Sequence, residues 1–173
     1  MIAIRPTERA DLKKLLEIRS NKLVQDFHVD DPPSNHELFE SLFINNSSDH
    51  HISCWHTVLV NNEPVGYIAT QSLFDQTRIA HYLGFNLSPD FWNKGVMTNA
   101  LTQRIDQLFD ERADAVIMAH TLNINVSCIR LLEKLNFKED DVTWFDRLIR
   151  RFSNKNKSWK IKYRLTRENW KTT

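Results

Sequence analysis

The sequence contains few glycines, few cysteines and no long apolar run. Its three glycines, Gly66, Gly84 and Gly95, exclude both a GxGxxG dinucleotide loop and a GxxxxGK[ST] phosphate loop. Its two cysteines, Cys54 and Cys128, form no disulfide framework, so a reducing cytoplasm is the expected compartment. The apolar runs are only a few residues long and the N-terminus has no apolar signal segment, so neither a membrane span nor a secretory signal is expected.

What is present is the composition of a globular protein. Hydrophobic residues make up 41% of the 173 residues and charged residues 26%, which is ordinary for a packed domain. A chain of this length can bury roughly 70% of the surface that its unfolded form exposes. We therefore expect one domain over residues 1–173 that needs neither a disulfide nor a metal to fold.

The net charge of +1 hides an uneven distribution. Residues 147–173 contain ten Lys or Arg and a single acid, whereas the rest of the chain has 13 bases and 21 acids. Such asymmetry is typical of contact with an acidic partner or nucleic acid, but it also fits a C-terminal edge hairpin kept soluble by lysines. The second interpretation is favoured, and no direct nucleic-acid binding is expected.

The hydrophobic pattern alternates between strand and helix periods along the chain. Strands are predicted at 2–5, 52–60, 65–73, 79–87 and 115–120, with two basic strands from about 142 around a turn at 153–158; helices are predicted after Thr7, from Ser34, at 96–111 and at 125–135. A hairpin turn is expected at 61–64. This order predicts a mixed α/β sheet of about seven strands, with parallel neighbours and right-handed crossovers in its middle.

The junction between the strand at 79–87 and the following helix indicates a binding site. Lys94 and Gly95 open this helix, and Gly95 lets the backbone turn freely close to a ligand. The first amides of the helix, from Val96 to Thr98, have no partners within it and point outward with the positive end of the helix dipole. Phosphate or pyrophosphate is the expected occupant.

This stretch resembles the acetyl-CoA-binding motif of the GNAT N-acetyltransferase family, most closely its RimJ/RimL branch of ribosomal-protein N-terminal acetyltransferases. In that branch the motif often reads Trp-Gly-Lys-Gly before a helix. Trp92, Lys94 and Gly95 match it, whereas Asn93 stands in place of a common Gly and Met97 in place of the usual Ala. The resemblance extends to the strand segment 82–85 that precedes the loop.

Two later segments extend the resemblance in the family's order and spacing. Residues 125–137 resemble the family's second conserved helix; the matching positions are Asn125, Leu132, Lys134 and Phe137. Cys128 stands where Ser is usual. Asn136 stands where Gly is usual, as expected of a residue that tolerates a left-handed conformation at a helix end. Residues 163–170 resemble the closing strand of the branch, so the likeness covers nearly the whole chain.

The resemblance implies a GNAT fold, with about seven mostly antiparallel strands splayed at the centre and about four helices. Acetyl-CoA would lie between the strand ending at Leu87 and the strand ending near Leu122. Its pantetheine arm would pair with the backbone of Phe85, Asn86 and Leu87, and its pyrophosphate would bind the loop and helix start formed by Asn93, Lys94, Gly95, Val96, Met97 and Thr98. Asn125 would hold the pantetheine, cap its helix, or do both.

The implied reaction is direct attack of a substrate amine on the thioester. A protein N-terminal amine, with a pKa near 8 against about 10.4 for lysine, needs only modest help from a base. Candidate bases are Asp146, His81 and His120. Cys128, with a thiol pKa expected to be lowered by the helix dipole, or Ser127 would protonate the leaving thiolate.

The expected acceptor is an amine, with a protein N-terminus of the ribosomal-protein type favoured. Two alternatives remain open at this point, a small-molecule amine acceptor and a non-catalytic acetyl-CoA-binding module. The group His50, His51, Cys54 and His56 contains zinc-ligating residue types but has no second ligand pair at finger spacing, so no metal site is expected.

Overall fold

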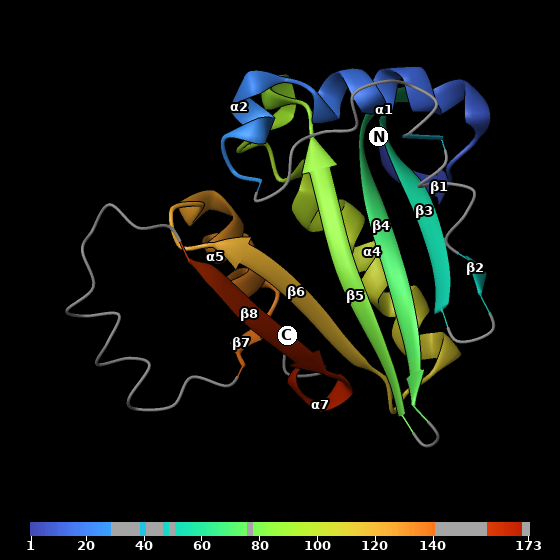
Figure 1. Ribbon diagram of the computed structural model, residues 1–173, viewed down its shortest axis with the longest axis vertical. Helices are drawn as coiled ribbons and strands as arrows, with labels where there is room; N and C mark the ends of the chain where they lie inside the picture. The colour runs from blue at the N-terminus through green and yellow to red at the C-terminus, as the bar shows by residue number, and fades with distance from the viewer. Residues whose placement is uncertain (29–38, 41–46, 49–50, 76–77, 141–158, 171–173) are drawn as a thin grey trace.

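A mixed β-sheet organises the chain (Figure 1). The computed structural model describes residues 1–28, 39–40, 47–48, 51–75, 78–140 and 159–170. Within them the sheet has eight strands, ordered β1-β3-β4-β5-β6-β8-β7, with β2 pairing with β3 off this path. The strands are β1 (Ile2–Pro6), β2 (Ser47–Ser48), β3 (His51–Val60), β4 (Glu63–Asp75), β5 (Arg78–Leu87), β6 (Val116–Leu122), β7 (Lys138–Glu139) and β8 (Lys160–Thr166). The expected mixed sheet is confirmed.

The hairpin between β3 and β4 is tighter than the sequence predicted. Asn61 and Asn62 have φ values of 51° and 70°, and two successive positive values fit a type I′ turn, whose twist matches that of the strands it joins. Glu63 and Pro64, which were expected in the turn, already belong to β4. Of the two predicted C-terminal strands, β8 is observed, and the first strand and the turn lie outside the described residues.

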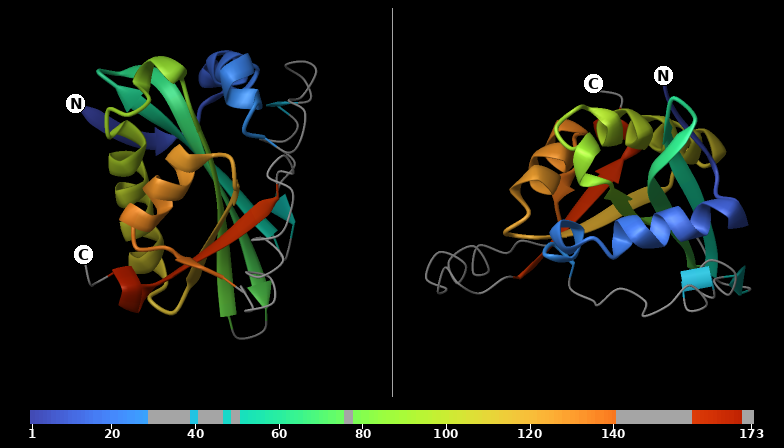
Figure 2. Two further views of the ribbon diagram at one scale, coloured as in Figure 1. Left: turned by 90° about the vertical axis from the view of Figure 1, so that its left-hand side faces the viewer. Right: turned by 90° about the horizontal axis from the view of Figure 1, so that it is seen from above.

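Helices cover both faces of the sheet (Figure 2). On one face lie α4 (Val96–Glu111) and α5 (Val126–Lys134), and on the other α1 (Leu12–Arg19) and α2 (Lys22–Gln25). The shorter elements are η1 (Arg9–Asp11), η2 (Pro89–Phe91) and α7 (Arg167–Trp170). The large core lies under α4 and α5, and a smaller one joins α1 to Phe39 and Tyr67. No helix in the described part of the chain is long and apolar enough to cross a membrane.

The N-terminal helix does not begin as predicted. Thr7 does not cap it; its hydroxyl instead accepts a hydrogen bond from Thr57 Oγ1 on β3, at 3.0 Å. The turn is closed by Asp11, whose carboxylate accepts from the Glu8 amide and pairs with Arg5 at 2.7 Å. Thr7 therefore links the end of β1 to β3. The helix predicted from Ser34 lies mostly outside the described residues.

The sheet opens between β5 and β6. These two strands pair in parallel only where Ala80–Leu83 lie opposite Val116–Ala119. Beyond that point β5 continues to Leu87 alongside β4, while β6 continues to Leu122 alongside β8. Every other pair in the sheet is antiparallel. The expected splay at the centre of the sheet is confirmed, and it positions the cleft described next.

Candidate active site

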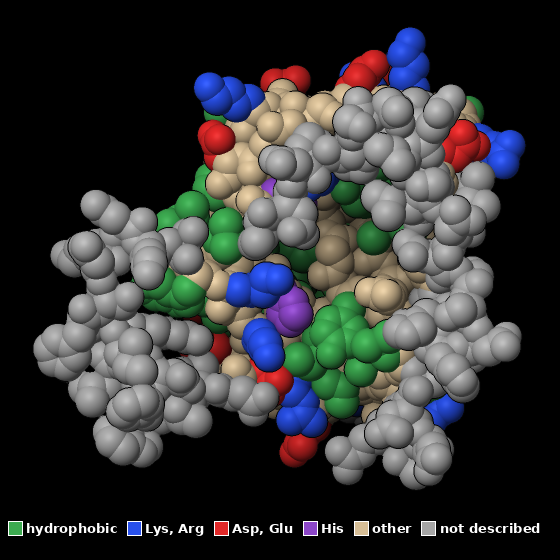
Figure 3. Space-filling model, in the orientation of Figure 1, with side chains coloured by type: hydrophobic (Ala, Val, Ile, Leu, Met, Phe, Trp, Pro, Cys, Tyr) green, Lys and Arg blue, Asp and Glu red, His purple; other side chains and the backbone are tan. Residues whose placement is uncertain are grey.

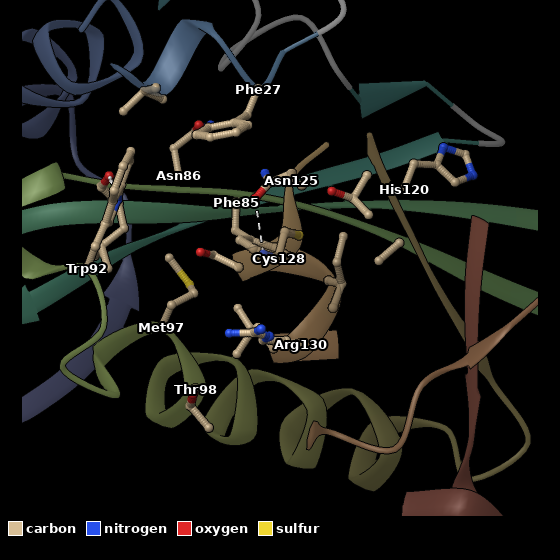
Figure 4. A pocket seen from close by; sticks show the side chains of 18 of the residues that line it. Phe27, Phe85, Asn86, Trp92, Met97, Thr98, His120, Asn125, Cys128 and Arg130 are labelled. Carbon is tan, nitrogen blue, oxygen red and sulfur yellow. Dashed lines mark hydrogen bonds between the residues drawn. The ribbon is translucent and has the colours of Figure 1, made fainter. Parts of the chain in front are cut away.

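The cleft occupies the gap between the diverging strands and has a volume of about 850 Å³. Its walls come from the end of β5, the loop before α4, the end of β6, the first turns of α5, and α2 with the residues after it (Figure 4). Most of the residues implied by the resemblance line it, namely Phe85, Asn86, Leu87, Asn93, Gly95, Val96, Met97, Thr98, Asn125, Ser127 and Cys128. Segments distant in the sequence thus meet in one cavity.

One described residue that the resemblance implies, Lys94, is not among those that line the cleft. Lys94 is exposed and does not line the cavity; its ammonium lies over the Phe91 ring, 5.6 Å from the ring centre. Asp146 lies outside the described residues. Of the other two candidate bases, His120 lines the cleft. His81 does not line it; its Nδ1 is 2.8 Å from Ser72 Oγ on β4.

The loop before α4 is fixed to the end of β5. Trp92 Nε1 donates a hydrogen bond to the Leu87 carbonyl at 2.9 Å, and the Trp92 ring meets Phe27 edge-on. Asn93 and Gly95 both adopt left-handed backbone, with φ of 57° and 72°. Asn is among the few side chains that tolerate this conformation, so Asn93 can stand where the family motif has glycine.

The start of α4 presents unpaired backbone donors to the cleft. Gly95 is the N-cap and supplies no side-chain cap, so the first amides of the 16-residue helix lack an acceptor within it. Apart from Gly95 and its neighbours in the chain and helix, no atom of the described residues lies within 4 Å of the point where a Cβ on Gly95 would sit. The open approach and the helix dipole together suit an anionic group such as a phosphate.

Asn125 caps helix α5. Its side-chain Oδ1 accepts a hydrogen bond from the Cys128 amide at 3.1 Å, which satisfies one of the free donors of the first turn. The predicted capping role is confirmed. The Asn125 side chain also borders the cleft (Figure 4).

The pKa of the Cys128 thiol is shifted in the opposite direction to the prediction. Burial raises the pKa of this thiol, and a hydrogen bond with Thr121 opposes the rise only in part. The expected lowering by the helix dipole is wrong, because the cost of a buried thiolate exceeds the benefit from the helix end. The thiol is therefore protonated at neutral pH and can donate a proton.

A hydrogen-bonded chain at the α2 side of the cleft was not predicted. His28 Nε2 and Asn86 Oδ1 are 2.6 Å apart, and Asn86 Nδ2 donates to the Tyr67 hydroxyl at 2.6 Å. Tyr67 is buried and stacks on Trp55 with ring centres 4.9 Å apart. These hydrogen bonds fix the Asn86 side chain at the point where β5 separates from β6. No local sequence pattern pairs residues 28 and 86, which are 58 positions apart.

Comparison with known proteins assigns the protein to a family. The profile of the acetyltransferase (GNAT) domain matches residues 2–138. The chain belongs to the GNAT acetyltransferase family. Members of this family use acetyl-CoA, and the splayed strands are those of the GNAT fold. No curated protein matches the sequence.

Solved structures share the fold at low sequence identity. Spermidine N-acetyltransferase from Vibrio cholerae, in complex with CoA and spermine, is 14% identical with a TM-score of 0.78, over 98% of this chain and 97% of that one. An acetyltransferase of the GNAT family from Bacillus anthracis is 19% identical (TM-score 0.73, 96% and 95%). Ribosomal-protein-S5-alanine acetyltransferase from Vibrio fischeri is 14% identical (TM-score 0.69, 98% and 94%). The likeness therefore spans GNAT enzymes with different acceptors.

The described residues contain no group of three or more His, Cys, Asp or Glu side chains able to hold a metal ion. Of the four residues considered for zinc, Cys54 is 3.2 Å from a guanidinium nitrogen of Arg104. This nearby positive charge disfavours a cation there.

Proposed function

We propose that this protein is an acetyl-CoA-dependent N-acetyltransferase whose acceptor is a protein N-terminal amine, as in the RimJ/RimL branch. The observation that carries the proposal is the cleft itself, which joins an open edge of β5 to the uncapped start of α4. A strand edge offers amide and carbonyl groups to an extended ligand. A helix start offers donors to a phosphate. These are the two ends of a pantetheine-pyrophosphate ligand.

The end of β5 and the start of α4 would each bind a different part of acetyl-CoA. The backbone of Phe85 and Asn86 would pair with the pantetheine, while the Leu87 carbonyl already accepts from Trp92. The amides from Gly95 to Thr98 would hold the pyrophosphate. Bound in this way, acetyl-CoA supplies an acetyl thioester at the point where β5 and β6 diverge, close to Cys128 and Asn125.

The protein must assist the proton transfers that accompany direct attack of the amine on the thioester. The neutral amine forms a bond to the thioester carbonyl carbon, the carbon–sulfur bond breaks, the nitrogen releases one proton to water or to an imidazole of the cleft, and the departing thiolate takes up a proton. We assign that proton to Cys128, whose thiol is protonated at neutral pH because burial raises its pKa. Ser127 is the alternative donor and is more exposed.

The acceptor assignment rests on the bases that line the cleft. Among the described residues that line it, the imidazoles are His28 and His120, and there is no carboxylate. Burial and the charges of Lys160 and Lys162 lower the pKa of His120. Such weak bases suit an N-terminal amine with a pKa near 8 better than an alkyl amine with a pKa above 10.

A substitution at Gly95 tests where acetyl-CoA binds. Gly95→Asp places a carboxylate beside the proposed pyrophosphate, so calorimetry should show acetyl-CoA affinity falling at least tenfold, about 1.4 kcal/mol. Gly95→Asn is the matched control, because it keeps the shape and the left-handed backbone without the charge. A folded Gly95→Asp variant that binds as tightly as Gly95→Asn would refute this placement.

A thiol-release assay tests the reaction. The full chain is given acetyl-CoA with a panel of N-terminal peptides, polyamines and amino acids. Faster CoA release with peptides than with polyamines supports the proposal. Release with polyamines alone favours the small-molecule class, and binding of acetyl-CoA without any release favours a non-catalytic module.

A further inference from the structure

Two lysines of β8 lie beside His120 of β6 on one face of the sheet. On β6, His120 lies opposite Lys162 of β8, and Leu122 lies opposite Lys160. Directly paired residues of neighbouring strands share a face of the sheet. The His120 ring also meets the Tyr82 ring edge-on, with centres 5.8 Å apart, so this is the face of the sheet on which α1 and α2 lie. We call Lys160, Lys162 and His120 the basic rim.

None of the three rim residues is among those assigned to acetyl-CoA, and two of them, His120 and Lys160, line the same cleft. Alternation along β5 puts Tyr82 and Asn86 on the rim face, whereas Leu83 and Leu87 belong to the core beneath α4. Figure 3 shows lysine and arginine side chains gathered around a histidine on the face that carries β6 and β8. An acceptor that approaches the end of β5 from this face passes the rim.

Neither rim lysine forms an ion pair with a described residue. No carboxylate of a described residue lies within 4.0 Å of either ammonium. The described residues that line the cleft include Arg130, Lys134 and Lys160 and no acid. Burial first, and the positive charges of Lys160 and Lys162 second, lower the pKa of His120, which agrees with the two lysines lying near this ring.

We infer that the acceptor is anionic near its reactive amine, and specifically that the enzyme prefers N-terminal peptides with acidic residues immediately after the first residue. This inference rests on the proposed function and narrows its substrate class. Opposite charge across a binding site raises both affinity and the rate of encounter, whereas like charge excludes wrong ligands. A polyamine, with several positive charges, is disfavoured by the same field.

The test uses the full chain and three peptides that differ only in charge. The peptides begin Ala-Glu-Glu, Ala-Gln-Gln and Ala-Lys-Lys, share the rest of their sequence and are amidated at the C-terminus. Calorimetry in the presence of CoA, which cannot react, measures binding separately from turnover. We expect the acidic peptide to bind about tenfold more tightly than the neutral one at low salt, and this advantage to shrink toward 1 M salt.

Charge reversal then assigns the preference to the rim. The double variant Lys160→Glu and Lys162→Glu should lose the preference for the acidic peptide and favour the basic one. The double variant Lys13→Glu and Lys14→Glu makes the same total change of charge on the exposed side of α1 and should keep the wild-type order. Equal binding of all three peptides, or a preference that survives the double reversal, would overturn the inference.

The outcomes separate this inference from the proposed function. If the acidic peptide binds best but releases no CoA from acetyl-CoA, the charge preference stands and peptide acetylation fails. If peptides are acetylated at rates independent of their charge, peptide acetylation stands and the role of the basic rim fails.

Discussion

Residue 128 illustrates how a side chain's surroundings decide its chemistry. The thiol is half-buried and its pKa is raised by burial, so it is protonated at neutral pH and is a poor nucleophile. We predict that Cys128→Ala lowers kcat at least tenfold and leaves acetyl-CoA affinity within about twofold. An effect of that size is typical of a lost proton donor. Steady-state kinetics with calorimetry on the same samples measure both quantities.

Two companion variants make this prediction specific. Cys128→Ser should recover most of the turnover, because a hydroxyl keeps a proton to donate in nearly the same place. Ser127→Ala should have little effect, since Ser127 is exposed. Wild-type turnover in Cys128→Ala, combined with a loss in Ser127→Ala, would transfer the donor role to the serine.

At the scale of one element, helix α5 offers a way to separate stability from binding. Asn125 caps the helix through the Cys128 amide, so Asn125→Ala should cost about 1 kcal/mol of unfolding free energy. Asn125→Ser keeps a capping oxygen and should cost only a few tenths. Urea denaturation measures this difference.

Acetyl-CoA affinity of the same two variants separates the roles of Asn125. If the amide also holds the pantetheine, both variants should lose affinity, whereas only the alanine variant should lose stability. If Asn125→Ser binds acetyl-CoA as tightly as the wild type, the role of Asn125 is limited to capping the helix.

Elements with strong local signals were predictable from the sequence. The helix at 96–111 was predicted at its observed bounds, because apolar residues recur at helical spacing after a glycine N-cap. Asn136 was predicted to end α5 in a left-handed conformation, and its φ is 62°. Thr7 was predicted wrongly, because its hydroxyl bonds to a residue 50 positions away and a local capping pattern carries no information about such a partner.

The same distinction holds for the site. The loop and helix start were found through a motif within one stretch of sequence, and Asn93 fits it because the backbone there is left-handed. The His28–Asn86–Tyr67 network depends on a side-chain contact across 58 positions, and the basic rim depends on strand pairing across about 40 positions. The pKa of Cys128 was misjudged because burial depends on the packed core and not on position in the helix.

For the whole molecule, a buried polar cluster between the sheet and α4 connects stability to pH. Arg104 is buried and donates to Thr70 Oγ1, at 3.3 Å, and to Cys54 Sγ, at 3.2 Å. Burial and this guanidinium lower the pKa of His56 from 6.5 to about 4. The same two causes, in the same order, lower the pKa of His81, with Glu111 opposing them. Among the described residues, His56 Nδ1 and His81 Nε2 have no hydrogen-bond partner.

The direction of the pH effect follows from these pKa values. Between pH 6.5 and 4 the unfolded chain binds a proton at His56 that the folded chain does not bind, so the folded state loses stability as the pH falls. From pH 7.5 to 5.0 the loss from His56 should be on the order of 1–2 kcal/mol, allowing for partial solvent access. Carboxylates of ordinary pKa titrate mostly below this window. Urea denaturation at the two pH values should therefore show a smaller difference in His56→Gln than in the wild type. An equal loss in both proteins would exclude His56 as the source, because glutamine takes up no proton in this range.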